Sequence, residues 1–123
     1  MPRKKLSESE KLSKVIVEGI LSKKGQKVMQ LNLTELPNAV SDFFVLCHGT
    51  SDIQVKAIAD AVIDETLKNS GSKPWHKEGF ENAEWILLDY VDVVVHIFKE
   101  ETRAFYNLEN LWADAEVKTF KDS

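Results

Sequence analysis

The segment that decides the fold is WILLDYVDVVVHIF, residues 85–98. Residues 85–89 and 93–98 are two short runs of mostly aliphatic and aromatic side chains, and residues 90–92 separate them. Two such runs with a short break between them are typical of an antiparallel β-hairpin. We therefore expect this hairpin to form part of a sheet, with the rest of the chain packed around it.

The two faces of this hairpin differ in chemistry. Because alternate side chains of a strand point to the same side, one face is aliphatic and the other is mixed. We expect helices to cover the aliphatic face and the mixed face to be more open; it carries Trp85, Asp89, His96 and Phe98. Rings beside a carboxylate and an imidazole resemble the composition of a protein-binding hot spot. The alternative is that His96 is a hydrogen-bonded core histidine and Asp89 an acid at a strand end.

A helix is expected after the hairpin. Glu100 and Glu101 suit the positive, N-terminal end of a helix dipole. Apolar residues then recur at helical spacing, which predicts one helix whose stripe packs on the sheet: Ala104, Phe105, Leu108, Leu111, Trp112 and Ala115. The chain after Ala115 is polar, and we expect residues 116–123 to be a frayed tail.

Two further helices are expected in the first half of the chain. Residues 7–24 and about 51–69 carry apolar side chains at helical spacing. Each stretch opens with a capping box, which pairs a serine with an acid or amide three residues later: Ser7 with Glu10, and Ser51 with Gln54. These signals place the start of both helices.

Three further strands complete the predicted sheet. Residues 28–33 alternate between apolar and polar side chains like a half-buried strand. Residues 43–47 are a continuous apolar run, which is typical of a central strand, and residues 75–78 are a candidate short strand. With the hairpin they make a mixed sheet of about five strands flanked by helices, an α/β or α+β fold.

Composition indicates a single domain, residues 1–123, with its core at about 6–115. The chain has 123 residues, of which 43% are hydrophobic. Its net charge of −4 disfavours broad RNA binding and suits a basic protein partner, although the same charge could serve solubility alone. Cys47 is the one cysteine and lies in a core-like run, and we find no secretory signal and no span for a bilayer. We expect a reduced, cytoplasmic location.

Catalytic and metal-binding patterns have little support. The loop at 49–51 precedes a helix and could cradle a phosphate, and Asp89 with Asp92 could hold a magnesium ion. The loop lacks the lysine and the spacing of a P-loop, however, and a helix cap explains Ser51. The histidines are scattered singly, at His48, His76 and His96. We expect no enzyme activity, no metal and no cofactor.

Several motifs, taken together and in this order, resemble the ribosomal silencing factors, also called the Iojap family. They are SDFFV at 41–45, SDIQVKAIAD at 51–60, EG at 78–79, the hairpin at 85–98 and RAFYNLENLW at 103–112. The likeness extends from about Leu6 to Ala115. The family hairpin usually has glycine where Val91 stands, and a β-branched residue resists positive φ, so we expect the turn shape to differ.

The resemblance implies a fold similar to that of nucleotidyltransferases, without enzymatic activity. It implies binding to the large ribosomal subunit through the fourteenth protein of the large-subunit series, on the subunit-joining face, with little direct contact to RNA. The bound protein is then expected to keep the small subunit from docking and to repress translation.

Seven residues are our candidates for contact with this partner: Trp85, Asp89, His96 and Phe98 on the mixed face, with Asp92, Tyr106 and Glu109 at its rim. Arg103 is expected instead to hold the junction of sheet and helix by pairing with a nearby acid. The same aromatic face could pair with a second copy, so a homodimer is expected for the free protein. A nucleotidyltransferase-like enzyme and an RNA-binding module remain the alternatives.

Overall fold

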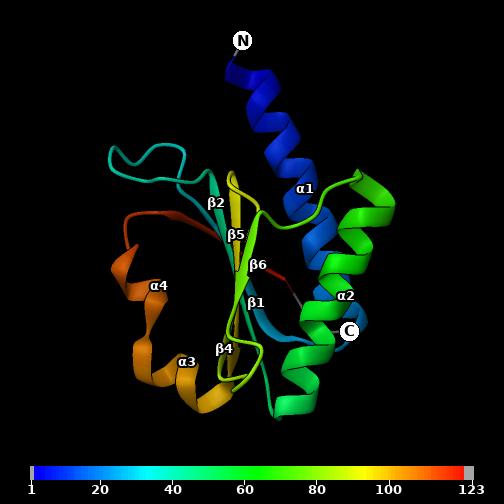
Figure 1. Cartoon of the computed structure of the whole chain (residues 1–123). Coiled ribbons are helices and arrows are strands. Elements are labelled where there is room, and N and C mark those ends of the chain that lie inside the picture. The colour runs from blue at the N-terminus through cyan, green and yellow to red at the C-terminus, as the bar shows by residue number, and fades with distance from the viewer. Residues whose placement is uncertain (1, 121–123) are drawn as a thin grey trace.

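The computed structural model describes residues 2–120, with side chains from residue 8 onward. Figure 1 shows a single sheet, seen nearly edge-on, with helices on both of its faces. The elements in chain order are α1 (Pro2–Ser22), β1 (Gln26–Asn32), β2 (Phe43–Gly49), α2 (Asp52–Ser70), β3 (His76–Glu78), β4 (Trp85–Asp89), β5 (Val93–Lys99), α3 (Glu100–Tyr106), α4 (Leu108–Leu111) and β6 (Glu116–Phe120). The expected mixed sheet flanked by helices is confirmed, with six strands in place of about five.

The strands lie in the order β3-β4-β5-β2-β1-β6. β2 and β5 are parallel neighbours at the centre, and the other neighbouring strands pair antiparallel. Every residue of β2 is buried, as its apolar run predicted. β4 and β5 form the expected hairpin, in which Trp85 pairs with Phe98 and Asp89 pairs with Val94.

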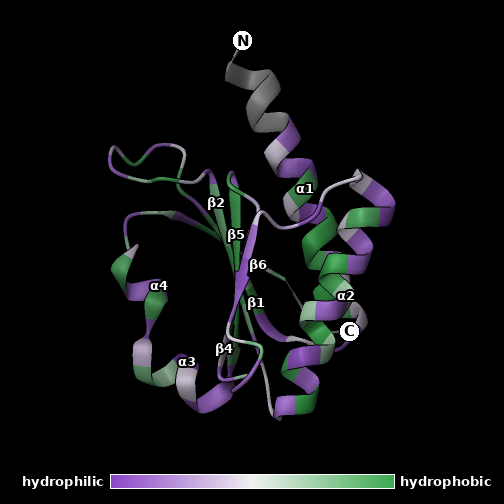
Figure 2. Ribbon diagram, viewed as in Figure 1, coloured by the Kyte–Doolittle hydropathy of each residue, from purple (hydrophilic) through white to green (hydrophobic). Residues whose placement is uncertain are grey.

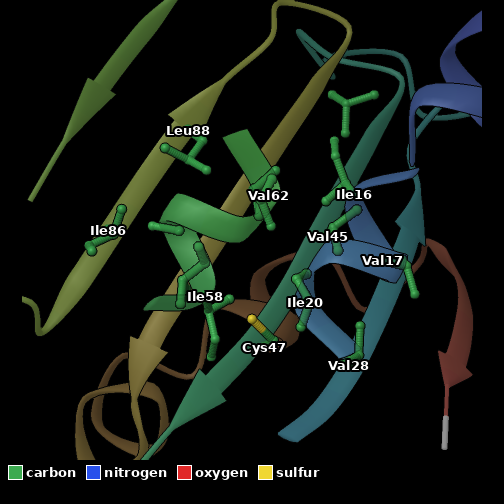
Figure 3. Close-up of a cluster of buried hydrophobic side chains, with 14 of the residues drawn as sticks. Ile16, Val17, Ile20, Val28, Val45, Cys47, Ile58, Val62, Ile86 and Leu88 are labelled. Atoms are coloured by element: carbon green, nitrogen blue, oxygen red, sulfur yellow. The ribbon is translucent and has the colours of Figure 1, made fainter. Parts of the chain in front are cut away.

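α1 and α2 together cover one face of the sheet (Figure 1). Figure 2 shows hydrophobic residues concentrated in β5 and on these two helices where they adjoin the sheet. The larger core lies between them, and Figure 3 labels many of its members: Ile16, Ile20, Val28, Val45, Cys47, Ile58, Val62, Ile86 and Leu88. Burial of one such aliphatic side chain stabilises the fold by about 1.5–3 kcal/mol, so this core is a major source of stability.

α2 begins and ends as its sequence predicted. The hydroxyl of Ser51 accepts the backbone N–H of Gln54 at 3.1 Å, and Gly71 closes the helix in a left-handed conformation with φ 62°. The amide of Gln54 also donates to the carbonyls of Lys23 and Lys24, at 3.2 and 3.1 Å. The start of α2 is thereby joined to the end of α1.

α1 begins earlier than expected. It starts at Pro2 and not near Ser7; proline suits the first turn of a helix because the N–H it lacks has no partner there. The side chain of Ser7 lies outside the described side chains, and with it the expected capping box.

The chain after Ala115 is not a frayed tail. Glu116–Phe120 form β6, which pairs antiparallel with β1 between Val28 and Asn32. Most side chains of β6 are exposed, so the segment lacks the alternation of apolar and polar residues that reveals a half-buried strand. Residues 121–123 of the expected tail lie outside the described residues.

The second face of the sheet carries a smaller core beneath α3 and α4 (Figure 1). Its buried members are Leu31, Leu33, Phe44, Leu46, Val94, Phe98, Leu108 and Ala115. The mixed face is therefore less open than expected, because the segment after the hairpin folds back over it. In the part of the chain that the structure describes, no helix has both the length and the apolar character needed to cross a bilayer.

Candidate functional site

Trp85 is the centre of an aromatic cluster on the α3 side of the sheet. It is the first residue of β4, and its cross-strand partner is Phe98 of β5, whose ring centroid lies 4.9 Å away. The ring of Tyr106, the last residue of α3, lies 5.0 Å from Trp85, and Phe105 packs edge-on against Tyr106 at 5.0 Å. The rings therefore form a continuous series from the core to the surface.

Exposure divides this series into two parts. Phe98 is fully buried, Trp85 is half-buried, and the side chains of Tyr106 and Phe105 are 53% and 80% exposed. We call Trp85, Phe105 and Tyr106 the ring surface. The expectation that Phe98 faces an open surface is wrong, because Trp85 and α3 cover it.

His96 lies in the core beneath Trp85. Only 5% of its surface is exposed, and its Nδ1 accepts a hydrogen bond from the indole Nε1–H of Trp85 at 3.1 Å. Because an indole N–H can only donate, Nδ1 must be unprotonated, and the neutral ring carries its proton on Nε2. Burial disfavours the charged form and lowers the pKa of His96 to about 4. His96 therefore supports the ring surface from below and is not part of its exposed area.

The helix expected after the hairpin is broken in two. α3 ends at Tyr106, Asn107 adopts a left-handed conformation with φ 49°, and the one-turn helix α4 follows. Asparagine visits this conformation more readily than most residues. The expected apolar stripe is therefore split. Leu108 is buried, whereas Phe105, which sequence reasoning assigned to packing, points to solvent.

A buried Arg103 fixes the two short helices to the sheet. Its Nε donates to Glu109 at 3.2 Å, one terminal nitrogen donates to the carbonyl of Lys27 at 2.8 Å and lies 3.1 Å from Nδ1 of His48, and the other lies 3.0 Å from the sulfur of Met29. The expected junction role of Arg103 with an acid partner is confirmed. Glu109, predicted at the rim of the binding face, is engaged in this ion pair, which spans the break at Asn107.

Asp89 and Asp92 lie at the far end of the hairpin. Asp89 is four residues from Trp85 along β4, a distance of about 13 Å in a strand. One carboxylate oxygen of Asp89 accepts the N–H of Val91 at 2.8 Å, and the carbonyl of Asp92 accepts the N–H groups of Asp42 and Phe43 at 2.8 and 3.1 Å. The structure does not bring these two acids to the ring surface.

Val91 adopts a backbone conformation that favours glycine. Its φ is 77°, and the N–H of Asp92 donates back to the carbonyl of Tyr90 at 3.0 Å, which makes a tight γ-turn. The hydroxyl of Ser41 donates to the carbonyl of Val91 at 3.0 Å and secures the turn from the neighbouring loop. A β-branched side chain thus occupies positive φ, despite the resistance that its shape predicts.

Three other acids are near neighbours of the ring-surface residues in the sequence. Glu84 precedes Trp85, and Glu100 and Glu101 open α3; all three side chains are exposed. The hydrogen bond to Asp52 is the largest cause of the raised pKa of Lys99, and the nearby charges of Glu101 and Glu84 raise it further. Sequence reasoning used Glu100 and Glu101 only as helix-start residues, and their closeness to an exposed aromatic cluster was the signal it missed.

The groups considered for catalysis are engaged elsewhere. Ser51 caps α2, and the N–H of Thr50 donates to the side chain of Gln54 at 2.8 Å, so this loop uses donors that a phosphate would need. Burial raises the pKa of the Cys47 thiol to about 12, with a smaller opposing effect of Arg103. Within residues 2–120 no group of three or more His, Cys, Asp or Glu side chains is placed to hold a metal ion.

A pocket of about 610 Å³ lies beside Arg103, between β1, α3 and β6. Its lining includes Lys27, Met29, His48, Glu109 and Phe120. Lys27 has a φ of 48° at an irregularity in the pairing of β1 with β2, and its carbonyl faces Arg103. The carbonyl that accepts the hydrogen bond of the buried arginine thus belongs to the distorted part of β1.

Residues 6–123 match the family described as ribosomal silencing factor during starvation. The chain belongs to this family. A ribosomal silencing factor of Halalkalibacterium halodurans is 40% identical over 107 residues, 87% of this chain and 90% of that protein. The silencing factor of Bacillus subtilis is 43% identical over 93 residues, 76% of this chain and 77% of that protein. A crystal structure of a Chromobacterium violaceum protein, 34% identical, superposes with a TM-score of 0.79 and covers 85% of each chain.

Proposed function

We propose that this silencing factor binds the large ribosomal subunit on its subunit-joining face and prevents the small subunit from docking. Family membership supports a role at the ribosome. The observation on which the binding proposal depends is the ring surface: exposed Tyr106 packs on Trp85, which is itself anchored to the sheet, and exposed Phe105 packs on Tyr106. Aromatic side chains supported from below are the usual anchors of protein interfaces.

The proposed partner is a basic ribosomal protein, the fourteenth of the large-subunit series. Exposed carboxylates of Glu84, Glu100 and Glu101 neighbour the ring surface in sequence, and the chain has a net charge of −4. Negative charge around an apolar centre attracts a positive partner and repels the phosphates of RNA. Of the residues first expected at this interface, Trp85 and Tyr106 are its centre, whereas Asp89 and Asp92 would meet only a partner that reaches the far end of β4.

The proposed mechanism is steric and needs no bond-making. A chain of 123 residues has a radius of gyration of about 14 Å and forms an obstacle roughly 35 Å across. A body of this size at a joining face keeps the second subunit away for as long as it stays bound. The occupancy of the joining face then depends on the binding free energy. Each step of about 1.4 kcal/mol changes the dissociation constant about tenfold.

The proposal implies a cytoplasmic protein, where free subunits are available. It also gives the free protein a way to protect its exposed rings, through a homodimer in which two ring surfaces meet. Multi-angle light scattering of the free chain, with and without large subunits, tests this point.

A pelleting assay tests the binding proposal. Tyr106→Ala removes an exposed ring without opening the core, and we expect it to reduce co-sedimentation with large subunits of Bacillus subtilis by about tenfold or more, as for an interface hot spot. The matched control is Trp75→Ala, because Trp75 is 77% exposed but lies beside β3, outside the ring surface. Equal binding of the Tyr106 variant and the wild type would refute the assignment.

A further inference from the structure

His96 is surrounded by rings and aliphatic side chains. Phe44 meets it edge-on with a centroid distance of 4.8 Å, Phe98 stacks alongside at 6.2 Å, and Leu87 is its cross-strand partner. An imidazole at this place loses its contact with water almost completely. Burial of an imidazole here carries a desolvation cost that burial of a phenylalanine would not.

Only one of the two ring nitrogens recovers a hydrogen bond. Nδ1 accepts the indole N–H of Trp85, whereas the buried Nε2 has no hydrogen-bond partner among the described residues. A buried donor without an acceptor adds to the cost of burial. His96 is therefore not the fully hydrogen-bonded core histidine that the sequence left open. A buried polar group that lacks part of its hydrogen bonding is expected where the residue serves a function.

What the histidine provides is the orientation of one indole. Trp85 is half-buried, and its rotamer is held by packing against Phe98 and by this single hydrogen bond at 3.1 Å. Tyr106 also packs against the indole, and Phe105 packs against Tyr106. A rotation of Trp85 would therefore displace both exposed rings. Holding such rings still before binding lowers the entropy lost on association.

We propose that His96 is a positioning residue for the ring surface: its Nδ1 holds the Trp85 indole and, through it, the rings that meet the partner. This inference rests on the proposed function, since it assumes that the ring surface is where the large subunit is bound. His96 itself makes no contact with the partner, because it is buried under Trp85.

A double-mutant cycle separates positioning from general packing. The dissociation constant for large subunits is measured by biolayer interferometry for the wild type, His96→Phe, Trp85→Phe and the double variant. We expect His96→Phe to raise the dissociation constant about tenfold and to have no further effect once Trp85 is phenylalanine. His96→Gln, which keeps an acceptor, should recover most of the lost affinity. Trp75→Phe is the control and should bind like the wild type.

A second readout uses the free protein. In ¹H–¹⁵N spectra the indole N–H of Trp85, identified by its absence in Trp85→Phe, should exchange slowly with solvent in the wild type and in His96→Gln, and quickly in His96→Phe. Should His96→Phe fail to fold, the comparison of His96→Gln with the wild type and with His96→Leu replaces it.

The outcomes are distinguishable. The positioning role is overturned if His96→Phe binds large subunits like the wild type, or if His96→Phe weakens binding equally in the wild type and in Trp85→Phe. The proposed function survives either result if Tyr106→Ala still weakens binding. If the wild type itself does not bind large subunits, the proposed function fails, and this inference fails with it.

Discussion

At the scale of single residues, the hairpin turn contains a conformation that its side chain opposes. Val91 is held at φ 77° by two hydrogen bonds: its N–H donates to the carboxylate of Asp89, and its carbonyl accepts from the hydroxyl of Ser41. Positive φ in a non-glycine residue costs on the order of 1–3 kcal/mol. Replacement by glycine also loosens the unfolded chain, which costs about 0.4–1 kcal/mol.

Val91→Gly should therefore raise the free energy of unfolding by about 1 kcal/mol. Urea denaturation measures this change. Val40→Gly is the matched control, because Val40 is an exposed valine of a nearby loop without positive φ, and it should be neutral or slightly destabilising. A Val91→Gly protein no more stable than the wild type would show that the turn stores no strain.

His96 makes stability depend on pH. Its pKa is about 4 in the folded protein, below the usual value near 6.5 of an unfolded chain. Between these values the unfolded chain binds more protons, so stability falls as pH decreases from about 6.5 to 4. At pH 5 the loss from this group is about 2 kcal/mol relative to pH 7.5.

Urea midpoints at pH 7.5 and pH 5 test this dependence. The wild type should lose more stability than His96→Phe, which has no imidazole to protonate, while the other histidines and the carboxylates affect both proteins alike. Parallel losses in the two proteins would show that His96 is not protonated on unfolding.

At the scale of elements, the segment after the hairpin shows what the sequence could and could not predict. The apolar spacing of residues 104–115 predicted one helix, but only residues up to Tyr106 and from Leu108 to Leu111 are helical, because Asn107 interrupts the helix and the chain leaves it after Leu111. β6 was missed for a different reason, since a strand exposed along most of its length has no periodic pattern. β2 and the cap of α2 were predictable because burial on both faces and a side-chain cap each leave a local signature.

Breaking the link from Arg103 to Glu109 should loosen both short helices. Arg103→Met leaves the carbonyl of Lys27 and the partly buried carboxylate of Glu109 without the hydrogen bonds that Arg103 donates. We therefore expect the free energy of unfolding to fall by about 3 kcal/mol. Lys68→Met, which removes an exposed ion pair with Asp64 on α2, is the control and should change stability by less than about 1 kcal/mol.

Thermal unfolding measures these losses. Below the melting temperature, Arg103→Met should still bind large subunits more strongly than Tyr106→Ala does, because its effect on the ring surface is indirect. A melting temperature equal to that of the wild type would contradict the junction role.

At the scale of the whole molecule, the candidate site was predictable in its chemistry but not in its outline. The mixed face of the hairpin and its rim supplied Trp85 and Tyr106, which the structure brings together at the surface that we propose as the site. The burial of Phe98 and His96 depends on where α3 folds back, and that path follows from the long-range contacts of Arg103 with β1 and β2, which no local pattern reveals.

The steric proposal predicts that catalysis plays no part in silencing. Saturating amounts of the protein should suppress the association of isolated subunits in a sucrose gradient, without any nucleotide or cofactor added. Tyr106→Ala should suppress it only at concentrations about tenfold higher, and Trp75→Ala should act like the wild type. Normal association in the presence of saturating wild-type protein would disprove the mechanism.

The two edge strands of the sheet, β3 and β6, affect how the protein can aggregate. One border strand, β3, has only three residues, all exposed, and the other, β6, carries the exposed charged side chains of Glu116 and Lys118. Short and charged borders discourage the addition of a foreign strand. The two edges of the sheet therefore resist the strand-by-strand growth that leads to fibrils.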